Sequence, residues 1–163
     1  MMKENSIKVG MADMKLGKSP EVLTTLGLGS CVGIIIYDKS LKIGGLAHIM
    51  LPDSNKIRNN GNLYKFADTA ISDMLSKLLD EGCNHKEFVA KIAGGAQMFD
   101  FKNVDENMRI GTRNIDAVKR ILHEYKIPIT SSDVGSNYGR TIEFYTDTGV
   151  LKVKTVGHGI KEI

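Results

Sequence analysis

The spacing of apolar and polar positions divides the chain into short strands and two long helices. Apolar runs predict strands at residues 7–11, 21–25, 31–37, 43–51, 88–93, 141–145 and 150–156. Residues 146–149, Thr-Asp-Thr-Gly, are typical of a tight turn and join the last two strands as a hairpin. Apolar residues recur at helical spacing over 67–79 and again over 115–125. Gly82 and Pro128 follow these segments and predict where each helix ends.

This order of elements predicts an α+β fold, an α/β sandwich in which two long helices cover a mixed β-sheet. Several strands come in succession before the first helix, so the sheet cannot be built from βαβ units alone. The 163 residues are the length of one ordinary domain, and we expect a single domain over residues 1–163. The order of the strands does not follow from the sequence.

Composition and charge narrow the classes of function. The chain is 42% hydrophobic and 25% charged, which is typical of a globular domain, and its net charge is +3. Lysine and arginine are scattered rather than grouped, so nucleic-acid binding is not expected. No apolar stretch approaches the ~20 residues that span a membrane, and residues 1–5 do not begin a signal peptide. We therefore expect a cytoplasmic protein without membrane insertion, in which both cysteines are reduced.

Cys31 follows a glycine-rich turn and begins a strand. Residues 26–30 read Leu-Gly-Leu-Gly-Ser, and glycine permits close approaches of the backbone that other residues do not. Backbone N–H groups around Gly29, Ser30 and Cys31 would lie beside the thiol, where they could stabilise an oxyanion. The alternative is a structural cysteine, since free cysteine is among the most buried residue types. Position alone leaves the two interpretations about even.

His48 is a polar residue in an otherwise apolar strand, and the hairpin register decides whether it faces Cys31. Most strand histidines are ordinary core or sheet-face residues, so the register carries the argument. A two-residue loop would place the two residues directly opposite, with Cβ atoms about 5 Å apart. A four-residue loop would place them diagonally on one face, and a three-residue loop on opposite faces. Two of the three registers thus predict a thiol beside a base, and we expect His48 to lower the pKa of the thiol.

A third residue should orient the imidazole of His48. Thr25 lies on the preceding strand, six residues before Cys31, and could use its hydroxyl or its carbonyl. Asp53, five residues after His48, is the other candidate, although Pro-Asp-Ser is also typical of a loop turn. Spacing alone does not choose between them.

Two sequence blocks around these residues resemble the signature of the CheD family of chemoreceptor glutamine deamidases. The first is Thr-Leu-Gly-Leu-Gly-Ser-Cys at residues 25–31, and the second is Gly-Leu-Ala-His-Ile-Met-Leu-Pro-Asp-Ser at 45–54. Further matches lie at residues 64–70, 91–96, 98–99 and 110–114. The resemblance runs from about Gly10 to the C-terminus, and the two blocks together make it specific.

The resemblance implies an α/β sandwich similar to bacterial deamidating toxins, with a catalytic triad carried by Cys31, His48 and Thr25. It implies hydrolysis of selected glutamines to glutamate on methyl-accepting chemotaxis receptors, and of glutamate methyl esters in some members. The implied partners are the cytoplasmic helices of chemoreceptors and, for many members, the phosphatase CheC. The protein would then work in the cytoplasm at chemoreceptor arrays, without a cofactor.

Other residues give less specific signals. Cys83 follows a helix end and is interpreted as structural, and the histidines lack ligand spacing, so no metal site is expected. The Gly94-Gly95 turn lacks the lysine of a phosphate loop and is expected to allow close backbone packing. Phe99 and Phe101 are either core residues or part of a patch that binds the substrate helix.

Two rival functions stand beside the hydrolase. A redox protein would also use Cys31, but the chain has no Cys-x-x-Cys motif and no nearby resolving cysteine. A non-catalytic adaptor would bind receptors or a phosphatase without chemistry, and the intact set of Cys31, His48 and Thr25 argues against it.

Overall fold

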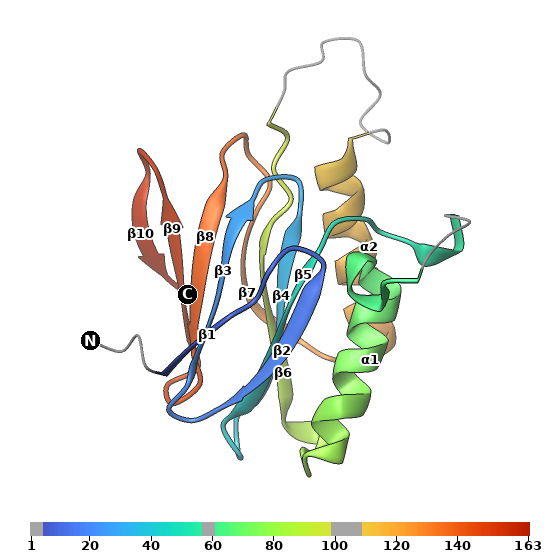
Figure 1. The fold of residues 1–163 in the computed structure, drawn as a ribbon, viewed down its shortest axis with the longest axis vertical. Helices are drawn as coiled ribbons and strands as arrows, with labels where there is room; N and C mark the ends of the chain where they lie inside the picture. The colour runs from blue at the N-terminus through green and yellow to red at the C-terminus, as the bar shows by residue number, and fades with distance from the viewer. Residues whose placement is uncertain (1–4, 57–60, 99–108) are drawn as a thin grey trace.

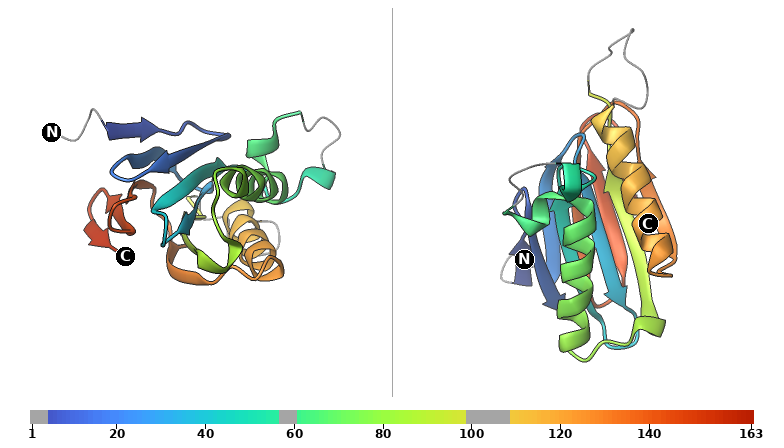
Figure 2. Two further views of the ribbon diagram at one scale, coloured as in Figure 1. Left: turned by 90° about the horizontal axis from the view of Figure 1, so that it is seen from below. Right: turned by 90° about the vertical axis from the view of Figure 1, so that its right-hand side faces the viewer.

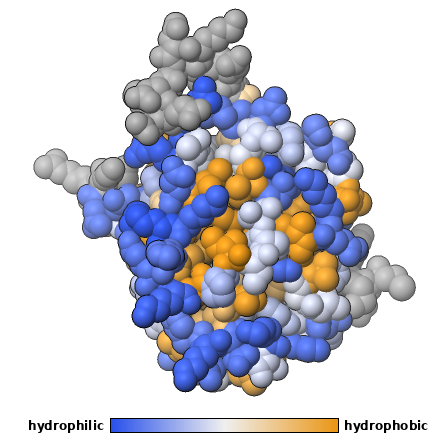
Figure 3. Space-filling model, turned by 180° about the vertical axis from the view of Figure 1, so that it is seen from behind, coloured by the Kyte–Doolittle hydropathy of each residue, from blue (hydrophilic) through white to orange (hydrophobic). Residues whose placement is uncertain are grey.

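Two five-stranded β-sheets lie face to face, and two helices cover the outer face of one of them (Figure 1). The computed structural model describes residues 5–56, 61–98 and 109–163. Figure 2 shows the layers from below and the two helices lying along the sheet that they cover. From behind, apolar residues gather near the centre of the face, ringed by hydrophilic residues (Figure 3). In these described ranges, no helix is long and apolar enough to cross a membrane.

The outer sheet, which lies away from the helices, has the strand order β1-β3-β8-β9-β10. Its strands are β1 (Ser6–Lys8), β3 (Val22–Leu28), β8 (Arg140–Tyr145), β9 (Val150–Thr155) and β10 (Gly159–Glu162). β1 pairs with β3 in parallel and the other neighbours are antiparallel, so this sheet is mixed. β8 and β9 form the hairpin that the sequence predicts.

The central sheet lies between the outer sheet and the helices, with the order β2-β5-β4-β6-β7. Its strands are β2 (Asp13–Lys18), β5 (Ile43–Ile49), β4 (Val32–Asp38), β6 (Phe88–Gly94) and β7 (Ile129–Val134). It is also mixed, because β6 and β7 run parallel. Every residue of β4 and β5 is buried, since both faces of the sheet are covered.

Alternate residues of the central sheet fill two separate hydrophobic clusters. Ile34 and Ile36 point toward the helices α1 (Ala67–Asp80) and α2 (Ile110–Glu124). Ile35 and Tyr37, on the same strand, pack toward the outer sheet. The side of a strand on which a residue falls therefore decides which of the two clusters it joins.

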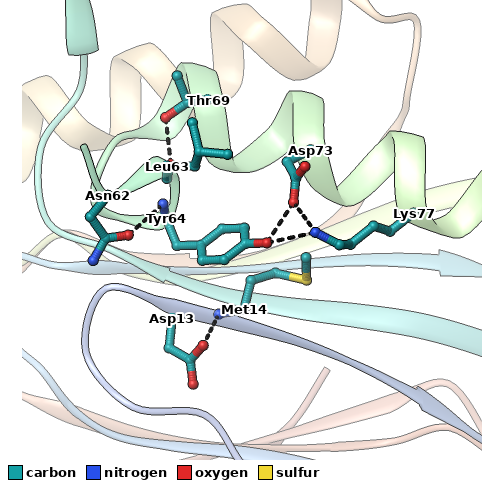
Figure 4. A network of polar contacts seen from close by, with 8 residues as sticks. All are labelled: Asp13, Met14, Asn62, Leu63, Tyr64, Thr69, Asp73 and Lys77. Atoms are coloured by element: carbon teal, nitrogen blue, oxygen red, sulfur yellow. Dashed lines mark hydrogen bonds and ion pairs between the residues drawn. The ribbon is translucent and has the colours of Figure 1, made fainter. Parts of the chain in front are cut away.

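The segment after β5 is tied to α1 by a polar network (Figure 4). In the described part of the chain, the connections contain the short 3-10 helices η2 (Ser54–Lys56), η3 (Leu63–Lys65) and η4 (His85–Glu87). The Tyr64 hydroxyl donates to Asp73 Oδ2 at 2.6 Å, and Lys77 Nζ donates to the same oxygen at 2.7 Å. These two bonds hold the pKa of Asp73 below its ordinary value. The network fixes where the chain enters α1.

The structure confirms the α/β sandwich, the mixed pairing and both long helices, and it adds detail that the sequence did not predict. The strands form two sheets instead of one. Three strands were not predicted, because β2 alternates around a glycine, β7 is mostly polar and β10 is exposed at every position. The second helix begins at Ile110, five residues before the predicted 115. The likeness to bacterial deamidating toxins stays a prediction.

Candidate active site

The register of β4 with β5 places Cys31 and His48 on one face. Gly33 pairs with His48, and Asp38 pairs with Ile43, which is the register of a four-residue loop. Cys31 lies two residues before Gly33, so it falls diagonally from His48 on the same side. That side faces the outer sheet, because a Cβ added to Gly33 would lie 2.8 Å from the Cδ1 atom of Ile142. One of the two favourable registers of the sequence analysis is therefore the observed one.

Thr25 reaches His48 across the space between the sheets. Its Oγ1 lies 2.7 Å from Nδ1 of His48 and also donates to the carbonyl of Val9 at 2.7 Å. A hydroxyl has one hydrogen, and Val9 takes it, so Nδ1 must carry the hydrogen of the other bond. In the neutral ring, Nε2 is then the unprotonated nitrogen. Among the described residues it has no hydrogen-bond partner, although it is buried.

Burial favours the neutral form of both side chains of the pair. It raises the pKa of the Cys31 thiol above its ordinary value, and the residue's own backbone N–H offsets only part of that rise. Burial lowers the pKa of His48. The expectation that His48 would lower the pKa of the thiol was wrong in direction, because the outer sheet desolvates both groups. The pair is a thiol beside a neutral base, with Nε2 free to take the proton.

Hydrogen bonds to its backbone carbonyl groups hold the turn at Cys31 in place. The carbonyls of Gly29 and Cys31 accept from the backbone N–H groups of Ala96 and Gly95, each at 2.8 Å. The carbonyl of Ser30 accepts from Nδ2 of Asn114 at 2.9 Å. Three successive carbonyls of the turn thus have donors from the segment after β6 and from α2.

The N–H groups of the turn differ in what they bind. The N–H of Gly29 donates to the carbonyl of Gly27 at 3.1 Å, so it is already used inside the turn. The N–H groups of Ser30 and Cys31 donate to no carbonyl in the described part of the chain. Of the predicted oxyanion donors, Ser30 and Cys31 therefore donate to no described carbonyl, whereas the N–H of Gly29 is already used.

Gly94 and Gly95 allow the close packing that the sequence analysis expected of them. Both have a positive φ, and a Cβ on Gly94 would lie 2.3 Å from the carbonyl oxygen of Cys31. A Cβ on Gly95 would lie equally close, at 2.3 Å, to the Cγ1 atom of Ile115 on α2. This turn therefore brings α2 and the Cys31 turn together, and any side chain there would force them apart.

The structure places the other predicted residues as follows. Asp53 accepts from the backbone N–H of Asn55, as a loop residue does, and Thr25 is the residue bonded to His48. Cys83 is buried in the cluster under the helices. Phe99 and Phe101, predicted to bind substrate, lie outside the described residues. Their neighbour Met98 is 47% exposed.

Asn114 is the site residue that the sequence reasoning missed. It lies in the motif Ile-Gly-Thr-Arg-Asn at 110–114, which carried part of the family resemblance but had no assigned role. Its side chain is fully buried and donates to the carbonyls of both Ser30 and Met50. The available signal was an amide on the apolar face of an amphipathic helix, where a polar group needs a partner.

Comparisons with known proteins show the family of the chain. Residues 50–155 match the family model described as CheD chemotactic sensory transduction. A "probable chemoreceptor glutamine deamidase CheD" of Caldanaerobacter subterraneus subsp. tengcongensis is 55% identical, over 99% of this chain and 100% of the relative. The "chemoreceptor glutamine deamidase CheD" of Halalkalibacterium halodurans is 50% identical, over 96% of this chain and 98% of its own length.

The similarity to a solved structure is weaker than the similarity to these relatives. The Bacillus licheniformis hypothetical protein YfiH superposes with a TM-score of 0.48 at 14% identity, over 77% of this chain and 50% of that one. The family match and the full-length relatives carry the assignment without it. This chain belongs to the CheD family.

Proposed function

We propose that this chain hydrolyses glutamine side chains of chemoreceptors to glutamate through a thioester on Cys31. The observation that carries the chemistry is the buried Thr25–His48 hydrogen bond, which leaves Nε2 unpaired on the face shared with Cys31. The names of the full-length relatives support the substrate class. Thr25 acts by holding the imidazole in one tautomer and one orientation.

The first half of the reaction forms the thioester. Nε2 of His48 takes the proton of the Cys31 thiol while the sulfur attacks the side-chain amide carbon, so a C–S bond forms and the carbonyl oxygen becomes an oxyanion. The N–H groups of Ser30 and Cys31, which donate to no carbonyl in the described structure, stabilise that oxyanion. The protonated His48 then gives its proton to the nitrogen, the C–N bond breaks, and ammonia leaves.

The second half releases glutamate. His48 draws a proton from water, which attacks the thioester carbon, and the C–S bond breaks as the sulfur recovers its proton. A glutamate methyl ester would pass through the same thioester with methanol as the leaving group. One site would therefore serve amide and ester, and an assay on methylated receptor fragments tests the second activity separately.

The substrate side of the proposal is a receptor helix held over the Cys31 turn. The side chain of Met98 lies over this turn, since a Cβ on Gly29 would lie 3.4 Å from its Cγ atom. We place Phe99 or Phe101, which follow it in sequence, as an apolar anchor for the helix. Work at receptor arrays in the cytoplasm, and binding of a CheC phosphatase, belong to the same proposal.

The anchor can be tested apart from the chemistry. Phe99→Glu and Phe101→Glu should each be measured for binding to a receptor cytoplasmic fragment and for the rate of Cys31 alkylation. At least one should weaken binding at an unchanged alkylation rate. Leu41→Glu is the matched control, because Leu41 is half exposed in the loop at the opposite end of β4. Unchanged binding in both phenylalanine variants removes them from the interface.

The activity itself is tested by mass spectrometry of receptor cytoplasmic fragments. Each deamidated glutamine gains about 1 Da, because an NH is replaced by an oxygen. The protein should modify specific glutamines, and Cys31→Ala should modify none. A fragment left unchanged by the intact protein, together with thiol peroxidase activity that survives His48→Ala, would favour the redox rival instead.

A further inference from the structure

The carbonyls of Gly29, Ser30 and Cys31 are held by three different donors, and only the middle one is a side chain. Backbone N–H groups of Ala96 and Gly95 hold the first and third. Nδ2 of Asn114 holds the carbonyl of Ser30 at 2.9 Å and that of Met50 at 3.0 Å. A side-chain donor can be removed by substitution, whereas the two backbone donors remain.

The orientation of the Asn114 amide follows from its surroundings. Nδ2 makes both bonds, and Oδ1 is buried without a partner among the described residues. Turning the amide over would place an oxygen against two carbonyl oxygens, so only the observed orientation is tolerable. The residue is fully buried, and its helix packs closely, since a Cβ on Gly111 would lie 2.5 Å from the carbonyl oxygen of Ala96. Asn114 therefore cannot easily turn away.

Holding the Ser30 carbonyl also directs the N–H of Cys31. Both groups belong to one peptide unit, which is planar and trans, so the N–H points opposite to the carbonyl. A hydrogen bond at the carbonyl also polarises the unit and strengthens its N–H as a donor. We propose that Asn114 is a positioning residue that aims the Cys31 N–H at the oxyanion formed during deamidation. This inference rests on the thioester chemistry of the proposed function.

The inference predicts that substitution of Asn114 slows one reaction of Cys31, deamidation, and leaves another, alkylation, nearly unchanged. Deamidation passes through an oxyanion and needs the aimed N–H. Alkylation by iodoacetamide displaces iodide at a saturated carbon and forms no oxyanion, so the Cys31 N–H enters it only by partly offsetting the rise that burial causes in the thiol pKa. Asn114→Asp keeps the shape but cannot supply both bonds, because a carboxylate has no hydrogen to donate and a protonated carboxyl has only one for the two carbonyls. It should lower kcat about tenfold to a hundredfold, the range expected for a misaligned oxyanion donor. KM and the alkylation rate of Cys31 should stay within about twofold of the intact protein.

Two further variants make the test independent of folding. Asn114→Leu removes the donor without adding a buried charge, and it should show the same split if Asn114→Asp fails to fold. Asn84→Asp is the matched control. In the described structure the side-chain oxygen of Asn84 accepts from the N–H of Lys86, a bond that a carboxylate can keep, and the residue lies beyond the far end of β4, where its backbone N–H donates to Asp38. It should leave kcat and alkylation unchanged.

Each outcome decides the matter. A fall in kcat with normal alkylation supports the positioning role. An equal fall in both rates would show that Asn114 only holds the nucleophile or the fold. Unchanged kcat in both Asn114 variants would show that the Cys31 N–H needs no positioning. Either result overturns the inference. Cys31→Ala in the same assay separates the two proposals, because deamidation that survives it removes the thioester chemistry itself.

Discussion

The two ends of β4 each hold a buried cysteine, and their surroundings differ in kind. Cys31 is 8% exposed and Cys83 is 7% exposed, and burial raises the pKa of both thiols. Cys31 shares its face with a neutral imidazole whose Nε2 has no partner in the described structure. Cys83 lies beside the carboxylates of Asp38 and Glu81, which add to burial and raise its pKa to about 11.

The comparison shows that burial and pKa alone do not identify a nucleophile. A negatively charged neighbour disfavours the thiolate and takes no proton from a thiol at neutral pH. A neutral imidazole can accept that proton at the moment of attack. In the described structure the N–H groups of Ser30 and Cys31 donate to no carbonyl, whereas the N–H of Cys83 donates to the carbonyl of Leu78. The function proposed for Cys31 therefore rests on the partners of its thiol and not on burial.

Removal of the Cys31 thiol should cause the largest loss of activity and so remove the difference between the two ends of β4. Cys31→Ala should lower deamidation at least about a thousandfold, because no other described group is placed to attack. The assay is mass spectrometry of receptor fragments, with circular dichroism to check the fold. Residual activity above that level would mean that another group, or water directly, is the nucleophile.

His48→Ala should have the next largest effect. Loss of a general base costs about 10²- to 10⁴-fold in rate, so kcat should fall within that range. Alkylation of Cys31 at neutral pH should also slow, while alkylation of Cys83 should not change. Mapping the alkylated peptides separates the two thiols. Equal alkylation of Cys31 with and without His48 would show that the two residues do not act as a pair.

Thr25→Val should reduce kcat by less, about tenfold to a hundredfold. The substitution keeps the shape but leaves the buried Nδ1–H of His48 without an acceptor, so the imidazole loses its fixed orientation. Thr25→Ser retains the hydroxyl and should retain most of the activity. If valine and serine behave alike, the hydroxyl does not orient the ring.

The pH dependence should show an acid limb that belongs to His48. Burial lowers its pKa below the ordinary 6.5, so the base is present above that lowered value and is lost as the pH falls through it. At pH values below the pKa of His48, kcat/KM should fall about tenfold per pH unit. Thiolate absorbance, measured as the difference between the protein and Cys31→Ala, should be absent at neutral pH, because burial raises the pKa of the thiol above its ordinary value. A thiolate already present at pH 7 would contradict the neutral pair.

Cys83→Ala should have the smallest effect on function. Deamidation should stay within about twofold, and the free energy of unfolding should fall by about 1 kcal/mol, since a small buried group is lost. Thermal unfolding and the receptor assay test both statements. A large loss of activity in a well-folded Cys83→Ala would mean that the two ends of β4 are less different than their partners suggest.

The side on which each residue lies could be predicted from the sequence, but the register could not. Two-residue periodicity puts Cys31 and His48 on one face for even loop lengths. The loop has four residues because the carboxylate of Asp38 accepts the N–H groups of Ser40 and Leu41, and Lys42 takes a positive φ. Asp-Lys-Ser-Leu-Lys is compatible with more than one such turn, so local sequence leaves the loop length open.

Contacts between distant segments could not be predicted from the sequence. Thr25 was one of two candidates to orient His48, and the choice required knowing that β3 lies in a separate sheet facing β5. The same sheet desolvates Cys31 and His48, which reversed the expected direction of the thiol pKa. Asn114 reaches the turn only because α2 packs against Gly95. Each of these depends on layer packing, which strand and helix periodicity do not encode.

The central claim is a covalent intermediate on Cys31, and its direct test is to trap it. The protein and its His48→Ala variant are mixed with a receptor fragment, quenched rapidly in acid and digested for mass spectrometry. The account predicts a Cys31 peptide heavier by the substrate peptide less ammonia, which disappears as glutamate forms. Continued turnover with no adduct on Cys31 at any time, in either protein, would contradict it and make direct attack by water the mechanism.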